Sequence, residues 1–560
     1  MSLSRQEAIA ALAAPGQPFE VVEADVNGVS QRVFKNALPT LRDYFASSRG
    51  LEATFLVYED EQWSFDEVMG QVDALSYALV HRYGIKVGDR VGIAMRNLPE
   101  WIVAFAAIVS VGAISVSLNA WWTGDELDYA INDSGLTLLV ADAERIARAH
   151  ATCQHLGVAI VGVRLDELEP LAPGVERWHD VLVRGAAMPD VALTPETDAT
   201  ILYTSGTTGF PKGAVSTHGA ISQAMMSILA AASINGAQRG PIESGSGQSP
   251  CFILIVPLFH VTGCIAVMMG CFAWHLKLVM MNRWEPTRAL ELIERHRVTA
   301  FVGVPTQSWD LIESPDFATY DTSSLTYVGG GGAPAPPALV ERVERSFAAG
   351  RPSLTYGMTE TNAVGISNYG DDYVSHPAST GPVAHIVVDL EIRDESRRPL
   401  GPDEHGEIWL KSPTLIRGYW GRPEETAATI VDGWLRTGDL GRVDAAGYLY
   451  VEDRVKDMIL RAGENVYSAE VEAALYEQPA VYEAAVLGLP DERLGEEVAC
   501  VVMLKAGMTL SADELRSALA TTLAGFKVPT RVAFTAEPLP RNPAGKLLKR
   551  QMRSYFDDAE

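Results

Sequence analysis

Short apolar runs typical of strands alternate with charged-faced helical segments along most of this chain. Predicted strand cores cover 90–94, 114–118, 137–140 and 299–302, and predicted helices cover 123–132, 286–296 and 336–348. This alternation favours an α/β architecture in which helices cover sheets. The chain has 560 residues, which is too long for a single hydrophobic core, so we expect several subdomains.

The composition changes near residue 453. Beyond that point the pattern predicts a helix at 469–476, strands at 484–488 and 498–504, and a helix at 512–523. These elements are enough for a small α+β domain of about 100 residues. We therefore predict a large N-terminal domain, 1–455, and a small C-terminal domain, 456–560.

The net charge and the cysteines indicate which partners and which cellular compartment to expect. The formal charge is −26, from 45 Lys and Arg against 71 Asp and Glu, which disfavours nonspecific binding to nucleic acid. The five cysteines form no CxxC pair, and their odd number indicates free, buried thiols in a reducing cytoplasm. We predict a cytoplasmic protein without a nucleic-acid partner.

Two apolar stretches, 101–118 and 251–281, reach or approach the length of a membrane span. The first carries Gly and Ser and changes from a helical to an alternating pattern, while Pro, Gly and His interrupt the second. Buried helices and strands fit both stretches better than transmembrane helices. Peripheral contact with a membrane and a homodimer stay compatible with the sequence.

The first chemical motif is Tyr203-Thr-Ser-Gly-Thr-Thr-Gly-Phe-Pro-Lys-Gly213, which follows the strand-like run 199–203. Glycines let the backbone approach a polyanion, and successive N–H groups in such a turn form an anion-binding nest. The spacing differs from that of P-loop NTPases. Candidate phosphate ligands are Thr204, Ser205, Gly206, Thr207, Thr208 and Lys212.

This string resembles the phosphate-loop signature of the ANL superfamily of adenylate-forming enzymes, which contains acyl-CoA synthetases, carrier-domain adenylation enzymes and firefly-type luciferases. Further motifs similar to those of the superfamily follow in order at 354–361, 437–439, 453–459 and 540–546. The resemblance covers nearly the whole chain. It implies a large N-terminal domain of several subdomains, with mixed sheets flanked by helices, and a small, mobile α+β C-terminal domain.

The resemblance assigns the parts of ATP to particular residues. The ring of Tyr356 offers a face for adenine, and Glu360 is an oxygen ligand suited to Mg²⁺, which the resemblance pairs with Thr204. Asp439 would accept the ribose hydroxyls, and Arg454 would add a donor. The remaining expected nucleotide contacts are Gly331, Gly332, Ala333, Gly357 and Thr359.

The resemblance also implies a reaction in two steps. ATP and a carboxylic acid first give an acyl-adenylate and pyrophosphate, and a CoA thiol then attacks the adenylate after the C-terminal domain has rotated. Lys546 would stabilise the charge that develops when carboxylate meets phosphate. Lys456 stands at the hinge position of the superfamily, and Gly463 would line the path of the CoA arm.

The acid is harder to identify from the sequence. The segment 256–263 resembles the entrance of the acid pocket and contains no acidic residue, which disfavours an amino acid as substrate. His260 would gate the pocket or contact the carboxylate, and a packed histidine is the alternative. Apolar or small candidates for the pocket wall are Val261, Gly303, Val304, Trp309, Gly329 and Gly330.

An apolar wall fits a hydrophobic acyl tail. We therefore predict an AMP-forming ligase that joins CoA to a medium- or long-chain fatty acid, with Mg²⁺ as cofactor and ATP and CoA as co-substrates. An aryl acid, or a stand-alone adenylation enzyme that loads a carrier protein, is the alternative. A lipid-binding protein without chemistry is disfavoured by the intact set Lys212, Glu360, Asp439 and Lys546.

Overall fold

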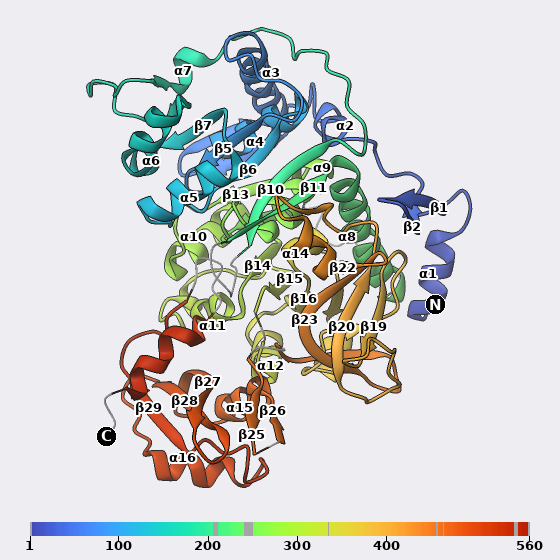
Figure 1. Ribbon diagram of the computed structural model, residues 1–560, viewed down its shortest axis with the longest axis vertical. Helices are drawn as coiled ribbons and strands as arrows, with labels where there is room; N and C mark the ends of the chain where they lie inside the picture. The colour runs from blue at the N-terminus through green and yellow to red at the C-terminus, as the bar shows by residue number, and fades with distance from the viewer. Residues whose placement is uncertain are drawn as a thin grey trace.

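The computed structural model describes residues 3–204, 211–239, 250–333, 335–454, 457–462, 464–541 and 547–557. Figure 1 shows the large N-terminal region, which contains most of the helices and strands of the chain, above the small C-terminal domain. The described strands form two large sheets, a smaller antiparallel sheet, the sheet of the C-terminal domain and a two-stranded sheet near the N-terminus. The mixed α/β class predicted from the sequence is confirmed.

The first large sheet has eight strands, and its inner strands are parallel. Strand β11 pairs antiparallel with β10 and with β21. Across the sheet the strands are β21 (Gly418–Tyr419), β11 (Lys212–Thr217), β10 (Asp198–Thr204), β6 (Ile114–Ser117), β5 (Arg90–Ala94), β7 (Leu138–Asp142), β8 (Ala159–Val163) and β9 (Val175–Arg177).

The second large sheet also has eight strands, with antiparallel pairs only at its two edges. In order they are β17 (Ile366–Tyr369), β16 (Arg351–Tyr356), β15 (Tyr327–Gly331), β14 (Ala300–Gly303), β12 (Cys251–Leu254), β13 (Lys277–Met280), β3 (Thr54–Tyr58) and β4 (Glu61–Ser64). Gly303 lies opposite Gly330, and Gly331 lies opposite Thr355, so β14, β15 and β16 end at one edge.

Helices complete the N-terminal layers. They are α2 (Leu41–Ala46), α3 (Phe65–His81), α4 (Pro99–Ser110), α5 (Gly124–Ser134), α6 (Ala143–Leu156), α7 (Trp178–Val181), α8 (His218–Arg239), the π-helix η1 (Thr262–Met269), α9 (Gly270–Ala273), α10 (Pro286–His296), α11 (Pro305–Glu313), α12 (Pro337–Ser346), α13 (Asp371–Ser375) and α14 (Pro423–Thr429). Short 3₁₀ turns are η2 (Phe317–Thr319) and η3 (Thr359–Thr361).

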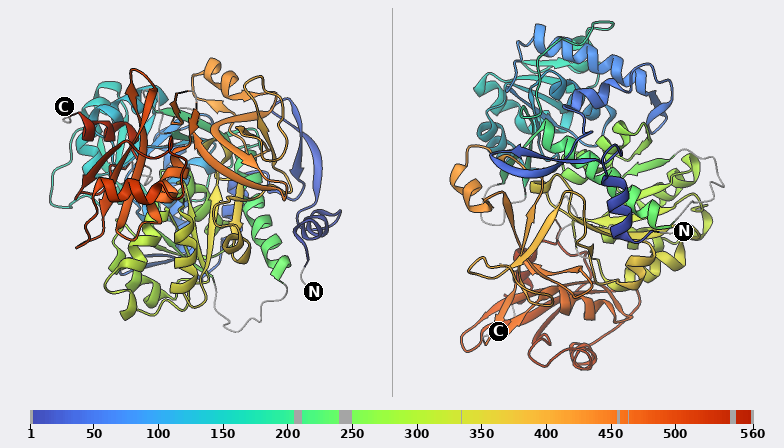
Figure 2. Two further views of the ribbon diagram at one scale, coloured as in Figure 1. Left: turned by 90° about the horizontal axis from the view of Figure 1, so that it is seen from below. Right: turned by 90° about the vertical axis from the view of Figure 1, so that its right-hand side faces the viewer.

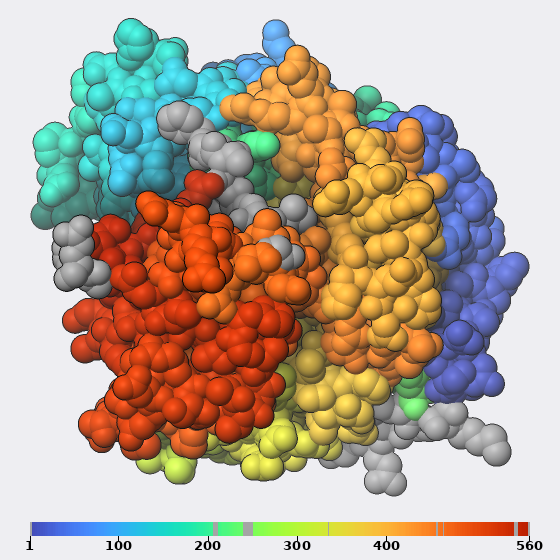
Figure 3. Space-filling view, turned by 60° about the horizontal axis from the view of Figure 1, so that its bottom comes forward, coloured from blue at the N-terminus to red at the C-terminus, as the bar shows by residue number. Residues whose placement is uncertain are grey.

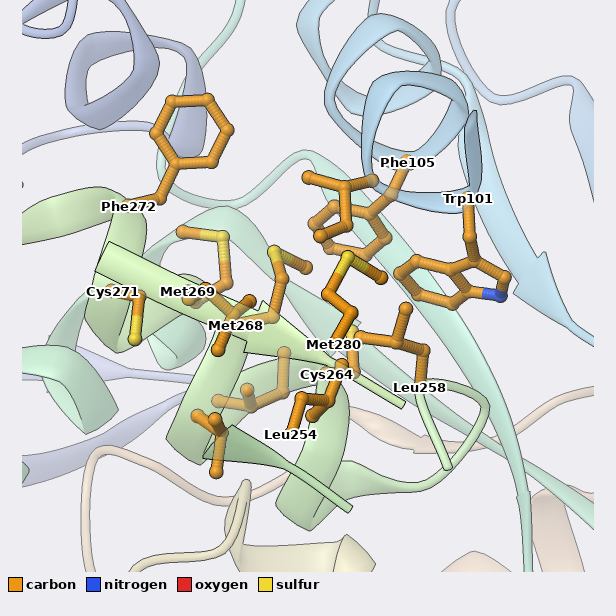
Figure 4. Packing of buried hydrophobic residues seen from close by; sticks show 14 of the residues in the cluster. Trp101, Phe105, Leu254, Leu258, Cys264, Met268, Met269, Cys271, Phe272 and Met280 are labelled. Carbon is orange, nitrogen blue, oxygen red and sulfur yellow. The ribbon is translucent and has the colours of Figure 1, made fainter. Parts of the chain in front are cut away.

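The main hydrophobic core lies between the two large sheets. Every residue of α4 is buried. Figure 4 shows Trp101 and Phe105 of this helix above Met268 of η1 and Met280 of β13. The rings of Trp101 and Phe105 stack with centroids 5.5 Å apart. The predicted buried helix and strand within 101–118 are thus α4 and β6, and 251–281 is a folded strand–helix–strand segment.

A third N-terminal sheet is antiparallel and lies beside the second large sheet in Figure 1. Its strands are β18 (Gly381–Pro382), β24 (Tyr448–Arg454), β23 (Trp434–Val443), β20 (Gly406–Lys411) and β19 (Asp389–Arg393), with β22 (Ile430–Val431) paired to β23. Strands β23 and β24 bring residues from the last third of the N-terminal region back toward the large sheets.

The C-terminal domain has its own sheet and core. The strands are β26 (Glu464–Val466), β25 (Ile459–Arg461), β28 (Gly495–Leu504), β27 (Val481–Asp491) and β29 (Arg531–Thr535), with helices α15 (Ser468–Tyr476), α16 (Ala512–Leu519) and η4 (Lys549–Phe556). Its apolar clusters contain only residues beyond 458. In Figures 2 and 3 this domain packs as a separate body against the N-terminal region.

The first residues of the chain lie along α8. Helix α1 (Arg5–Ala13) and the hairpin of β1 (Val21–Val26) and β2 (Val29–Phe34) share an apolar cluster with Ala230 and Ile234 of α8. Among the described residues, α8 is the one helix long and apolar enough to cross a bilayer by length and composition. Core helices of folded domains also meet these criteria, and 44% of its apolar stretch is buried.

Periodicity located the local elements well. The predicted helix 286–296 coincides with α10, and the predicted helix 469–476 is α15. The predicted helix 512–523 ends at Leu519, four residues earlier than expected. All five cysteines are free and buried, which confirms that prediction.

Candidate functional site

Several predicted site residues lie where strands of the two large sheets end. Gly303, Gly331 and Tyr356 are the last residues of β14, β15 and β16, and Thr204 is the last residue of β10. In open α/β sheets, ligands bind outside the carboxyl ends of the strands. The strand order therefore places motifs from distant parts of the chain at the carboxyl ends of strands in the two large sheets.

The phosphate-loop motif forms the connection between β10 and β11. Thr204 and Lys212 face each other in the antiparallel register, and the Thr204 hydroxyl donates to the Lys212 carbonyl at 3.4 Å. The ammonium of Lys212 lies 3.2 Å from Oε2 of Glu425 on α14. Ser205, Gly206, Thr207 and Thr208 lie outside the described residues.

The adenine and ribose candidates converge across two sheets. Asp439 on β23 and Arg454 at the end of β24 are direct neighbours in the strand register. Oδ1 of Asp439 lies 3.2 Å from Nε of Arg454, and Oδ2 accepts a hydrogen bond of 2.8 Å from the Tyr356 hydroxyl. Burial and the Asp439 carboxylate raise the pKa of Tyr356, so its hydroxyl stays a donor.

The glycine run after β15 provides open backbone near this edge. Gly332 has φ +75° and no heavy atom within 4 Å of an added Cβ, and it is exposed. Gly331 and Ala333 are half-buried. Gly357 has a different role, because a Cβ there would lie 2.8 Å from the carbonyl of Ala363 and would open the turn.

Glu360 occupies the 3₁₀ turn η3, which also contains Thr359. Its carbonyl accepts a hydrogen bond of 2.9 Å from the amide of Ile416, which fixes the turn. Its carboxylate oxygen Oε1 accepts a bond of 2.7 Å from the Tyr419 hydroxyl. A cavity of about 250 Å³ lies between Glu360 and the Thr437–Gly438 segment of β23, next to Asp439.

The donor set around Glu360 fits Mg²⁺ better than a protein-caged metal. Within the described part of the chain, no group of three or more His, Cys, Asp or Glu side chains could hold a metal ion. Mg²⁺ usually keeps several waters and binds through one or two carboxylates together with substrate phosphates. Glu360, at the wall of a cavity, matches that requirement.

His260 follows β12 and precedes the π-helix η1. The helix packs tightly here, since a Cβ on Gly263 would lie 2.2 Å from the carbonyl of Pro257. Burial lowers the pKa of His260 to about 4, so its imidazole is neutral near pH 7. Nε2 is buried and has no hydrogen-bond partner among the described residues. Val261 beside it is buried as well.

The predicted acyl-pocket residues do not form one continuous wall. Gly329 and Gly330 are neighbours in β15 and therefore face opposite sides of the sheet. Gly330 faces a cavity of about 20 Å³ bordered by α11 and α12. Trp309 lies on α11 with the Arg342 guanidinium 5.7 Å from its ring centre. Gly303 and Val304 are buried where β14 meets α11.

The predicted catalytic and hinge residues of the C-terminal region, Lys456, Gly463 and Lys546, lie outside the described residues. The described flanks of the last motif are ordered by contacts within the C-terminal domain. The backbones of Arg541 and Leu547 form an isolated antiparallel β-bridge. The guanidinium of Arg541 lies 2.9 Å from Oε1 of Glu483.

Sequence reasoning missed two side chains of the phosphate region, Tyr419 and Glu425. Tyr419 bonds Glu360, and Glu425 pairs with Lys212. The signal for both lies in the segment 418–425, where Gly-Tyr-Trp is followed by an acidic helix start. Neither contact follows from local spacing, because the two partners of each contact lie far apart in the sequence.

Comparison with known proteins matches two regions of the chain to family models. The family model for AMP-binding enzymes matches residues 44–420, and the model for the AMP-binding enzyme C-terminal domain matches residues 470–546. Feruloyl-CoA synthase of Amycolatopsis sp is 35% identical over 477 residues, which cover 84% of this chain and 90% of that protein.

A long-chain-fatty-acid–CoA ligase of Bacillus subtilis is 30% identical over 534 residues, covering 90% of this chain and 92% of that protein. Among solved structures, the o-succinylbenzoate coenzyme A synthetase of Bacillus subtilis in complex with ATP and magnesium ion aligns with a TM-score of 0.77. That alignment is 28% identical and covers 92% of this chain and 99% of the other.

Proposed function

This chain belongs to the AMP-binding enzyme family of the ANL superfamily, and from this premise we propose that it is an ATP-dependent acid–CoA ligase. The observation that carries the proposal is the cavity of about 250 Å³ between Glu360 and Thr437–Gly438. The cavity has a carboxylate suited to Mg²⁺ on one side and the residues of β23 that precede Asp439 on the other, which supports a nucleotide bound across it.

We infer roles for the charged and polar residues of this site. Asp439, held by Arg454 and Tyr356, accepts the ribose hydroxyls. Lys212 meets the phosphates, for which it exchanges its ion pair with Glu425. Glu360 and Thr204 would hold Mg²⁺, which when bound screens the charge of the phosphates.

The C-terminal residues complete the proposed reaction. The carboxylate of the acid attacks the α-phosphorus, the bond to pyrophosphate breaks, and Lys546 stabilises the charge on the transferring group. The CoA thiol then attacks the acyl carbonyl and AMP leaves. We infer that the domains divide at 1–455 and 456–560, that Lys456 is the hinge, and that Gly463 borders the CoA arm.

We propose that the acid is a medium- or long-chain fatty acid. The neutral imidazole of His260, whose buried Nε2 has no partner among the described residues, supports a place for the acid carboxylate beside apolar Val261. The long-chain ligase of Bacillus subtilis supports the same substrate class.

An aryl acid is the second candidate, because feruloyl-CoA synthase is 35% identical over 84% of the chain. A panel of fatty and hydroxycinnamic acids, assayed with ATP, Mg²⁺ and CoA for pyrophosphate and thioester, separates the two. Highest kcat/KM with fatty acids supports our proposal, and highest kcat/KM with hydroxycinnamic acids overturns the fatty-acid assignment. Pyrophosphate release with every acid but no CoA thioester would overturn CoA ligation and favour loading of a carrier protein.

The free, buried cysteines support a reducing compartment such as the cytoplasm as the site of action.

A further inference from the structure

Tyr419 lies between the two charged groups that the proposed function places on the phosphates and the metal. Its hydroxyl donates to Oε1 of Glu360 at 2.7 Å. The ammonium of Lys212 lies 5.3 Å from the centre of its ring, within range of a cation–π contact. One side chain therefore contacts both the anionic and the cationic candidate.

The backbone around Tyr419 is fixed from several sides. Strand β21 pairs with β11, and Tyr419 lies opposite Ala214, just beyond the end of the phosphate-loop motif. The amide of Tyr419 donates to the Thr426 hydroxyl at 2.9 Å, and the amide of Trp420 donates to the Gly213 carbonyl at 2.8 Å. The ring is thus held relative to β11 and α14 before any ligand binds.

The hydrogen bond to Glu360 has a fixed direction. A phenol O–H donates and a carboxylate oxygen only accepts, so Tyr419 is the donor and Glu360 the acceptor. No described residue donates to Oε2 of Glu360. The phenol therefore holds the carboxylate through one oxygen and leaves the other without a donor among the described residues.

We propose that Tyr419 is a positioning residue that holds Glu360 ready for the metal and keeps Lys212 beside the phosphates. The proposal rests on the proposed function, because it takes Glu360 as the metal ligand. The two contacts divide by chemistry: the hydroxyl acts on the metal ligand, and the ring acts on the phosphate ligand. Removing them separately therefore gives two distinct effects.

The test is binding of Mn²⁺, a spectroscopic substitute for Mg²⁺, measured by electron paramagnetic resonance with a non-hydrolysable ATP analogue. Tyr419→Phe keeps the ring and should raise the Kd of Mn²⁺ about tenfold, as expected for a lost hydrogen bond to a charged group. Its Kd for the analogue without metal should stay at the wild-type value. Tyr419→Leu should raise both constants.

Tyr450→Phe is the matched control, because the Tyr450 hydroxyl also bonds a carboxylate, that of Asp444 at 3.2 Å, away from the cavity. Both Phe variants preserve side-chain shape, and circular dichroism verifies that they fold. A wild-type Kd of Mn²⁺ in Tyr419→Phe, or an equal rise in Tyr450→Phe, would overturn the proposal.

Glu360→Gln separates this inference from the proposed function. If Glu360→Gln raises the Kd of Mn²⁺ and Tyr419→Phe does not, only the role of Tyr419 is wrong. If Glu360→Gln leaves the Kd unchanged, the assigned metal ligand itself is wrong. If both assignments are right, Tyr419→Phe raises the Kd of Mn²⁺ less in the Glu360→Gln protein than in the wild-type protein, because the two residues act through one contact.

Discussion

The hydroxyl of Tyr482 donates a hydrogen bond of 3.0 Å to Oδ1 of Asp310. Tyr482 belongs to β27 of the C-terminal domain, and Asp310 belongs to α11 of the N-terminal region. The other oxygen of Asp310 accepts a bond of 2.9 Å from Nε1 of Trp284. Burial raises the pKa of Asp310 despite these donors, so the contact joins the domains at a largely dry point.

Tyr482→Phe should shift the two half-reactions in opposite directions. Removing the hydroxyl weakens the domain arrangement seen here and leaves the alternative arrangement unaffected, so the population moves toward the latter. We expect the ratio of adenylation rate to thioester rate to change about threefold to tenfold. Pyrophosphate release from acid and ATP reports the first step, and thioester formation from synthetic acyl-adenylate and CoA reports the second.

Tyr476→Phe is the control for that experiment, since the Tyr476 hydroxyl bonds the Ala484 carbonyl within the C-terminal domain. It should leave the ratio unchanged. Equal loss of both half-reactions in Tyr482→Phe would show that the contact has no preference for one domain arrangement.

Lys546→Ala should lose adenylation by at least about a hundredfold, the scale for one preorganised electrostatic contact. With synthetic acyl-adenylate and CoA, the same variant should still form thioester at a substantial rate. Lys456→Pro should show the reverse pattern, because a fixed φ at the hinge restricts the rotation. Both half-reactions falling equally in a folded Lys546→Ala protein would contradict domain rotation.

Asp439→Ala should raise the KM for ATP about tenfold or more, because it removes the ribose acceptor and leaves Tyr356 and Arg454 without their shared partner. The wild-type enzyme should prefer ATP over 2′,3′-dideoxy-ATP, and the variant should lose that preference. A preference that persists in Asp439→Ala would place the ribose elsewhere.

Acid should destabilise the N-terminal region through its buried histidines. Burial lowers the pKa of His218 to about 4, that of His260 to about 4 and that of His385 to about 3. An unfolded histidine has a pKa of about 6.5, so between about pH 6.5 and 4 the unfolded chain binds protons that the folded chain does not. Stability is complete above this range and falls as the pH falls through it.

The variant His218→Asn tests how much the protonation of His218 contributes to the loss of stability in acid. His218 is fully buried, and its Nδ1 accepts a bond of 3.1 Å from the amide of Leu41, which an asparagine oxygen can also accept. The acid slope of the unfolding free energy should decrease by about 1.4 kcal/mol per pH unit. Urea unfolding followed by tryptophan fluorescence reports the N-terminal region, because all 11 tryptophans precede residue 456. An unchanged slope of the unfolding free energy against pH would show that His218 does not contribute to the loss of stability in acid.

The sequence predicted what depends on near neighbours. Helix α10, with Pro286 at its start and an apolar stripe, follows from spacing within one segment, as does the strand-like run 199–203 that lies in β10. The contacts that tie the site together do not. Tyr419 is 59 positions from Glu360, and Tyr482 is 172 positions from Asp310, so only the packing of whole sheets and domains brings them together.

Strand geometry also limits the predicted acid pocket. Gly329 and Gly330 were expected in one apolar wall, but successive residues of β15 face opposite sides of the sheet. Small or apolar character was visible in the sequence, whereas the direction of each residue required the register of β14, β15 and β16.

The burial of all five cysteines makes the native chain unreactive toward maleimide dyes. A cysteine introduced at Leu168, which is 93% exposed in the N-terminal region, and another at Met508, which is 46% exposed in the C-terminal domain, would be the only accessible thiols. A donor and an acceptor dye at these positions would report the distance between the two domains by resonance energy transfer. The rotation that we propose for the C-terminal domain would then change the efficiency of energy transfer in single molecules during turnover.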